Sequence, residues 1–163
     1  MNLRQPTDQD IARIMAVTPH HMMLEFMQHY GPLISDDSNY WNFLGTAWKA
    51  GGSFAEQAQW IELFQSKRRN RQKIMKTSER RAFARLPKVV SAYRCCDDAI
   101  EESQSICWSL DKDFVVEYAK EKQRKLILQM FFDKHDIFAY FNRRRESEIL
   151  VWRHHADKLY QGV

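Results

Sequence analysis

Residues 106–119 read ICWSLDKDFVVEYA, and this stretch sets the expected fold class. Residues 106–110 form a short apolar segment that favours a β-strand. Asp111 follows as a helix N-cap, because its side chain can accept a hydrogen bond from the first turn. Apolar residues then recur at helical spacing. They are Phe114, Val115, Tyr118 and Ala119. A strand that leads into a capped helix is typical of mixed α+β structure.

Strand-like segments lie on both sides of this stretch. Residues 89–93 predict a strand that leads into Arg94. Downstream, residues 125–132 run apolar as a buried strand does, and residues 136–141 form a second short apolar segment. Residues 146–152 alternate as Glu-Ser-Glu-Ile-Leu-Val-Trp. We therefore predict a compact α+β core over residues 88–163.

The preceding part, residues 1–87, predicts a helical subdomain that packs with this core as one unit. The first helix has an acidic start at Asp8, and the second opens at Pro19. Asp37 or Ser38 caps a third helix, and Ser53 with Glu56 forms a capping box for a fourth. The expected apolar face of that fourth helix is Phe54, Ala58, Ile61 and Phe64. Residues 78–86 predict a short fifth helix that ends before Pro87.

The composition excludes several classes of protein. The chain has 163 residues, of which 44% are hydrophobic and 28% charged, which argues against disorder. No apolar run approaches the roughly 20 residues that span a bilayer, and the polar N-terminus does not resemble a signal peptide. The three cysteines, Cys95, Cys96 and Cys107, form no CxxC pair. We expect reduced thiols, a cytoplasmic location and no membrane partner.

Positive charge gathers in one stretch, Lys67–Arg85, in which Glu79 is the only acid among the basic residues. Such a run is either a solvated helix face or a surface that docks on nucleic acid or on an acidic protein. Phe83 is the only aromatic residue in this stretch, which argues against stacking on single-stranded nucleic acid. The net charge of +4 favours an acidic partner only weakly.

Three short motifs carry polar groups at strand-like segments: Tyr93-Arg94, Cys107-Trp108-Ser109-Leu110 and Glu146-Ser147-Glu148. Their order resembles the Arg–Ser-Thr-Ser–Glu-x-Glu signature of the arginine-directed mono-ADP-ribosyltransferases. The region from about Val89 to Trp152 is similar to small phage-encoded members of that superfamily. The resemblance implies a split β-sheet core of the ADP-ribosyltransferase kind, with NAD as co-substrate.

The resemblance also implies a role for each site residue. Glu148 matches the catalytic glutamate, which stabilises the ribose cation that forms when nicotinamide leaves. Glu146 acts on the acceptor, commonly an arginine of a bacterial host protein, in the host cytoplasm. Arg94 binds NAD, Cys107 lies beside it, and Ser109 matches a serine that mostly braces the site. Aromatic residues pack against nicotinamide in this family, and the candidates are Tyr118, Phe132 and Tyr140.

Physical chemistry agrees with these roles. A guanidinium such as that of Arg94 suits phosphate or ribose oxygens. On a strand, Glu146 and Glu148 would point to the same face, roughly 7 Å apart. The alternative for this Glu-x-Glu is a solvated face paired with Arg143 or Arg145.

Two positions depart from the family pattern. Cys107 stands where the family has a serine, and Cys95 stands where the phage-type relatives have glycine. A thiol is a weaker hydrogen-bonding group than a hydroxyl, and the Cβ of Cys95 narrows the approach of a cofactor. These positions favour a second interpretation, a catalytically impaired ADP-ribosyltransferase fold that binds and inhibits a host protein or nucleic-acid complex.

We predict no metal site. The histidine pairs His20-His21 and His154-His155 have side chains that point apart, and no carboxylate or cysteine lies at ligand spacing from them. We expect surface or cap positions for both pairs.

Overall fold

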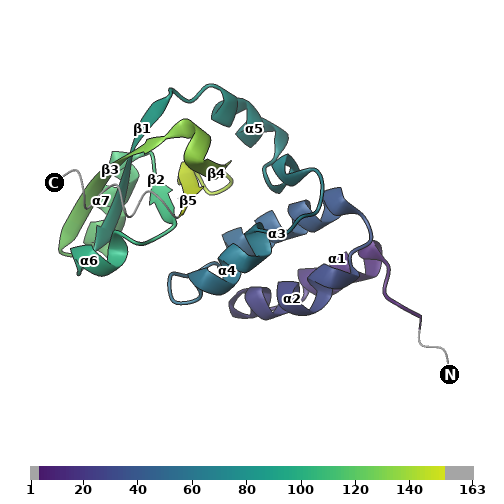
Figure 1. The fold of residues 1–163 in the computed structure, drawn as a ribbon. Helices are drawn as coiled ribbons and strands as arrows, with labels where there is room; N and C mark the ends of the chain where they lie inside the picture. The colour runs from purple at the N-terminus through teal and green to yellow at the C-terminus, as the bar shows by residue number, and fades with distance from the viewer. Residues whose placement is uncertain (1–3, 153–163) are drawn as a thin grey trace. The chain divides into compact units, whose positions relative to one another are not determined.

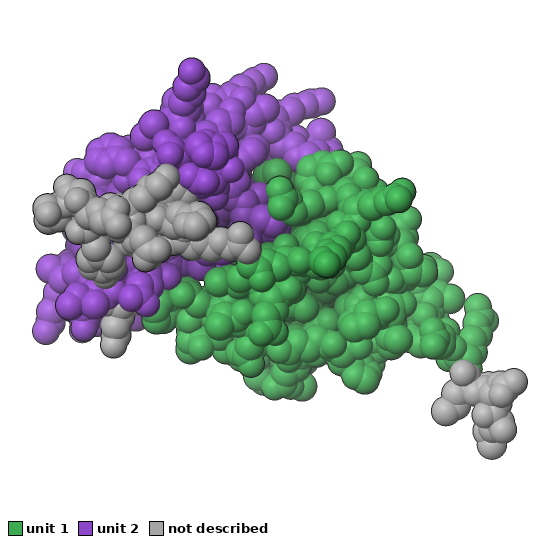
Figure 2. Space-filling view, in the orientation of Figure 1, with its two compact units in different colours: residues 1–76 green, residues 77–163 purple. Residues whose placement is uncertain are grey.

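The computed structural model describes residues 4–152. The chain forms two compact units, residues 1–76 and residues 77–163, which Figure 2 colours separately. The mixed α+β class is confirmed. The sequence placed the boundary after residue 87, whereas the structure groups the helix that precedes Pro87 with the sheet. Within residues 4–152, no helix is long and apolar enough to cross a membrane.

The first unit is helical, and its core is aromatic. Its helices are α1 (Asp8–Ala16), α2 (Met23–Tyr30), α3 (Asp37–Gly51) and α4 (Gln57–Phe64), with 3₁₀ turns at His20–Met22, Gly31–Leu33 and Arg71–Ile74. Trp48 packs edge-on against Trp60, with ring centroids 5.4 Å apart, and also contacts Phe64. Trp41 and Trp60 are fully buried. Large aromatic rings therefore contribute to the apolar surface that holds these helices together.

The start of α4 differs from the prediction. Ser53 contacts Glu56 at 3.2 Å, but the helix begins at Gln57 and has no side-chain cap. Phe54 consequently lies before the helix and is 37% exposed. The buried residues of α4 are Trp60 and Phe64, so the expected face was wrong except at its last residue.

Arg68, a member of the basic stretch, is part of the framework of the first unit. Its guanidinium donates to the carbonyls of Gly31 and Ile34, at 3.0 and 2.7 Å. It also pairs with Asp37 at 3.2 Å and lies over the ring of Tyr40. The Arg68 side chain is 21% exposed, and a guanidinium group with this little access to water needs such partners. Arg68 is therefore an exception in a stretch whose other basic residues are mostly exposed.

The second unit contains a five-stranded antiparallel sheet in the order β3-β1-β2-β5-β4 (Figure 1). Its strands are β1 (Val89–Cys96), β2 (Cys107–Ser109), β3 (Leu126–Asp133), β4 (Ile137–Phe141) and β5 (Glu148–Val151). Its helices are α5 (Thr77–Ala84), α6 (Ala99–Glu102) and α7 (Lys112–Glu121). Helix α7 packs against β1, β2 and β3, and α5 packs against β4. The Asp111 side chain caps α7 as predicted.

Strand β3 was expected to be buried, but among the strands of residues 4–152 it is an edge strand that pairs only with β1. Phe131 is 62% exposed, and Leu126 and Ile127 are also exposed. Phe132 alone in β3 is buried, where its ring meets Trp108. An apolar run does not distinguish an edge strand from a central one, which is why the prediction failed here.

The two neighbours of β1 are paired to it very differently. Strand β3 follows β1 from Val89 to Cys96, whereas β2 has one registered pair with it, Tyr93 with Ser109. Beyond that pair, the Arg94 guanidinium donates to the main-chain carbonyl of Cys107 at 3.0 Å. In a continuous sheet, this carbonyl would accept a hydrogen bond from the main chain of the neighbouring strand. Here it accepts one from a side chain. The sheet is therefore weakly paired between β1 and β2.

In the first unit, the carboxylate of Asp8 joins α1 to the start of α3. It accepts hydrogen bonds from the main-chain amides of Ser35 and Asp36, at 2.7 and 3.1 Å, and from Asn39 Nδ2 at 3.0 Å. Burial by itself would raise the pKa of Asp8, but the hydrogen bonds outweigh it and lower the pKa below the ordinary value of 3.8. The charged carboxylate therefore stabilises the fold.

We expect Asp8→Asn to lower the free energy of unfolding at pH 7 by about 1 kcal/mol, because an amide replaces charge-assisted acceptors. Since the folded pKa is lowered, the contribution of Asp8 is present at neutral pH and is lost as the pH falls below 3.8. Urea unfolding of both proteins at several pH values measures it. Glu62→Gln, at an exposed position of α4, is the matched control. A difference that persists unchanged in acid would contradict this assignment.

Candidate functional site

A pocket of about 230 Å³ lies in the second unit, where β1 and β2 separate. Its lining includes all five site residues that the sequence predicted: Arg94, Cys107, Ser109, Glu146 and Glu148. Helix α7 contributes Phe114, Val115 and Tyr118 to one wall. Three motifs that lie far apart in the sequence thus open onto one cavity. This meeting follows from the strand order, because β2 lies between β1 and β5.

Glu148 is the first residue of β5 and is only 7% exposed. It pairs in register with Ser109 of β2. The Cys107 thiol donates a hydrogen bond to Glu148 Oε2 at 3.1 Å. A carboxylate with so little access to water interacts strongly with any positive charge that develops beside it.

Glu146 lines the pocket, but not by the expected strand alternation. Strand β5 begins at Glu148, and the residues on both sides of Glu146 have positive φ, 57° at Arg145 and 46° at Ser147. The segment is therefore a tight loop, and the predicted strand start at residue 146 was wrong. Both carboxylates still line the pocket because the loop folds back toward β2, where Leu110 N donates to Ser147 O at 2.8 Å.

Ser109 braces this loop. Its hydroxyl donates to the carbonyl of Glu146 at 2.6 Å and accepts from the amide of Asp111 at 3.0 Å. The side chain is 7% exposed. One hydroxyl thus joins the end of β2, the start of α7 and the Glu146 loop.

The structure separates the aromatic candidates. Tyr118 lines the pocket and is 42% exposed, with Phe114 beside it at a centroid distance of 6.0 Å. Phe132 and Tyr140 are buried and are not among the lining residues. Phe114 was predicted only as part of the apolar face of α7. The helical spacing of residues 114 and 118 was the available signal, since it puts both rings on one face.

Two further lining residues bear on the function. Cys95 of β1, which follows Arg94 in the chain, lines the pocket. Arg124, which follows α7, also lines it and was not predicted. The pocket therefore holds two guanidinium groups and two carboxylates, an arrangement suited to a ligand that has both anionic and cationic parts.

The loop that carries Glu146 is anchored to α5 by Glu79. This carboxylate is 2% exposed, accepts from Asn142 N at 2.7 Å and pairs with Arg143 Nε at 3.2 Å. Arg143 therefore pairs with Glu79, whereas the sequence offered it as a partner for the Glu-x-Glu motif. Glu79 had been counted only as an acid within a basic run. Its burial has no local sequence signal, because the partners lie more than 60 residues away.

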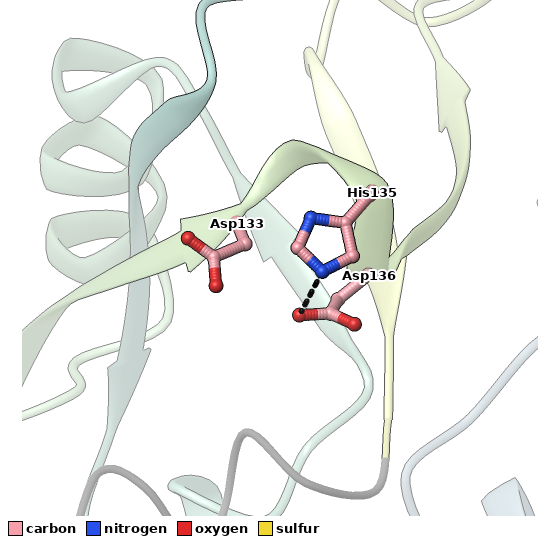
Figure 3. A group of neighbouring side chains, drawn as sticks. All are labelled: Asp133, His135 and Asp136. Atoms are coloured by element: carbon pink, nitrogen blue, oxygen red, sulfur yellow. Dashed lines mark ion pairs between the residues drawn. The ribbon is translucent and has the colours of Figure 1, made fainter.

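A separate polar group lies at the turn between β3 and β4. The potential ligand atoms of Asp133, His135 and Asp136 lie within 4.8 Å of one another (Figure 3). His135 Nε2 is 3.5 Å from Asp136 Oδ2, and the His135 side chain is 80% exposed. These residues are outside the pocket lining, and we assign them no role in the site. Of the histidine pairs, His20-His21 is exposed, and His154-His155 lies outside the described residues.

We expect Glu79→Gln to destabilise the second unit by about 3 kcal/mol, because the Arg143 charge, on a side chain only 14% exposed, then loses its ionic partner. Chemical unfolding followed by circular dichroism measures the change. Glu121→Gln, an exposed change on α7, is the control for the loss of one charge. The double variant Glu79→Gln, Arg143→Met should recover part of the loss. If Glu79→Gln unfolds like the control, Glu79 does not anchor this loop.

Comparisons of the chain with protein-family models, with curated proteins and with solved structures found no match. The geometry and charge of the pocket are therefore the observations from which a function can be inferred.

Proposed function

We propose that this protein is an NAD-dependent mono-ADP-ribosyltransferase that modifies a side chain, arginine, of a bacterial host protein. One observation carries the proposal: the nearly buried carboxylate of Glu148 shares a pocket with Glu146 and with the NAD-binding candidate Arg94. Within the α+β class, we also propose that the second unit has the split β-sheet fold of these transferases.

The reaction would proceed by loss of nicotinamide from NAD. The bond between the ribose C1′ and nicotinamide breaks, the electron pair leaves with nicotinamide, and positive charge develops on the ribose. Glu148 stabilises that charge, since a preorganised carboxylate in a desolvated pocket favours a cationic transition state. Nitrogen of the acceptor guanidinium then bonds to C1′, and Glu146 takes the proton that the nitrogen gives up.

The other lining residues fit the rest of NAD. The Arg94 guanidinium presents a fork of donors that suits phosphate or ribose oxygens. The exposed ring of Tyr118 and its neighbour Phe114 offer an apolar wall for the nicotinamide ring. Ser109 supports the site indirectly, through the Glu146 loop and the start of α7.

We expect Glu148→Gln to reduce transfer by about 10²- to 10³-fold, because a neutral amide replaces the charge that faces the ribose cation. The protein is incubated with labelled NAD and a bacterial lysate, and label on protein is counted. Glu121→Gln is the matched control and should transfer normally. Transfer by Glu148→Gln at the wild-type rate would defeat the assignment.

Glu146→Gln tests whether the two carboxylates have different roles. Because Glu146 acts on the acceptor, this variant should lose transfer to protein and still release nicotinamide from NAD. Equal loss of both activities would contradict the division of roles.

We expect Cys107→Ser to raise the rate of nicotinamide release by about threefold to tenfold, since a hydroxyl makes a stronger hydrogen bond to Glu148 Oε2 than the thiol does. Cys95→Ser is the paired control in the same pocket. Release assays on purified protein measure both variants. A fall in rate for Cys107→Ser would show that the thiol is the preferred partner of Glu148.

The second candidate function is that of an impaired transferase fold that binds and inhibits a host protein or a nucleic-acid complex. Cys107 and Cys95 favour it, because both line the pocket that NAD would enter. The double variant Glu146→Ala, Glu148→Ala distinguishes the candidates. If it keeps the full biological effect and captures the same partner, binding is the function. Label that nuclease removes, and protease does not, would instead indicate a nucleic-acid acceptor.

A further inference from the structure

Arg124 is fixed at the end of α7 by a backbone motif. Gln123 has a positive φ of 55°, its amide bonds to the carbonyl of Lys120, and the amide of Arg124 bonds to that of Ala119 at 2.9 Å. These two bonds form a Schellman motif, which ends a helix at a defined residue. Arg124 is therefore held at a fixed place in the pocket wall.

Asp97 orients the Arg124 side chain. Its Oδ2 pairs with Arg124 Nη1 at 3.0 Å, and its Oδ1 accepts from the amide of Lys125 at 3.2 Å. The side chains of Arg124 and Asp97 are 46% and 50% exposed, respectively. Arg124 also lines the pocket, and the planar guanidinium group suits the oxygens of an anionic ligand.

The carboxylates and Arg124 lie at opposite ends of the pocket. Along β1, Tyr93 is level with Ser109, which is level with Glu148, whereas Asp97 follows the end of the strand. Asp97 is four residue steps beyond Tyr93, about 13 Å at the usual rise of a strand. Helix α7 gives the same order, since Ser109 contacts its N-terminal side and Arg124 follows its C-terminus.

Arg94 lies between these ends. It follows Tyr93 on β1, and its guanidinium reaches the carbonyl of Cys107. The pocket thus changes from negative at Glu146 and Glu148 to positive at Arg94 and Arg124. In NAD, the nicotinamide ribose lies between the diphosphate and nicotinamide. The anionic diphosphate favours positively charged side chains, whereas the ribose carbon C1′, which becomes cationic, favours negatively charged ones.

We propose that Arg124, held by Asp97, binds the diphosphate of the co-substrate together with Arg94, and that this contact sets the direction in which the dinucleotide enters. The inference rests on the proposed function for its co-substrate. The diphosphate site itself can be tested without turnover. Electrostatics favours this orientation alone, because the reverse one would put the diphosphate against two carboxylates.

ADP is the probe, because it carries the diphosphate and lacks nicotinamide. Calorimetry should show that Arg124→Ala weakens ADP binding by about tenfold or more, as expected for loss of a charge-assisted hydrogen bond. Adenosine, which has no phosphate, should bind both proteins alike. Arg81→Ala, at an exposed position of α5, controls for net charge and should bind ADP as the wild type does.

Asp97→Asn separates ligand binding from a structural role. It removes the carboxylate charge, but its amide oxygen can still accept from Arg124 and the guanidinium keeps its own charge, so ADP binding should stay within about threefold of the wild type. If Asp97→Asn loses as much affinity as Arg124→Ala, the ion pair supports the fold and the proposal is overturned. Wild-type affinity for ADP in Arg124→Ala also overturns it, as does a wild-type protein that binds no ADP.

Turnover distinguishes this inference from the proposed function. With NAD, Arg124→Ala should raise KM and leave kcat nearly unchanged, because the residue touches no reacting atom. Normal cleavage of NAD by the wild type with an unchanged KM in Arg124→Ala refutes the Arg124 site and leaves the transferase proposal intact. ADP binding that depends on Arg124, in a protein that never cleaves NAD, supports the site and refutes the transferase proposal.

Discussion

The separation of β1 from β2 beyond the Tyr93–Ser109 pair is the constraint on which the site depends. If the ladder continued, main-chain atoms would bond across the gap. Instead, Arg94 uses its side chain to satisfy the Cys107 carbonyl, so that the strands can diverge without leaving that acceptor unsatisfied. The opening is lined by side chains from β1, β2, α7 and the loop before β5. On the other side of β2, its regular pairing with β5 positions Cys107 diagonally from Glu148, within hydrogen-bond distance of that carboxylate.

Charge within this opening follows from the elements that border it. The start of β5 and the loop before it supply carboxylates, held by Ser109 on one side and by the Glu79–Asn142 contact on the other. The end of α7 supplies a guanidinium at the far end. A reaction matches this polarity if it creates positive charge at one end of a substrate whose other end is anionic. The proposed transfer from NAD is such a reaction, and the thiol of Cys107 is the feature that distinguishes this pocket from a serine-containing one.

The sequence predicted the helices and strands better than the tertiary contacts of their residues. Asp111 and the spacing of residues 114–119 defined α7, because a cap and a helical period are local signals. The meeting of Arg94, Ser109 and Glu148 was expected from a resemblance in motif order, since strand order is not encoded in any short segment. Glu146 was misplaced because Arg145 and Ser147 adopt positive φ without being glycine. Glu79 and Arg124 were missed because their partners, Arg143 and Asp97, are distant in sequence.

A crystal structure of the protein with bound NAD, or with a slowly cleaved analogue, would show whether the gap between β1 and β2 holds the dinucleotide. We expect a dinucleotide along α7, with the nicotinamide ribose against the Glu148 carboxylate and the diphosphate at Arg94 and Arg124. A dinucleotide bound outside the gap between β1 and β2, or bound with its diphosphate against Glu146 and Glu148, would contradict it.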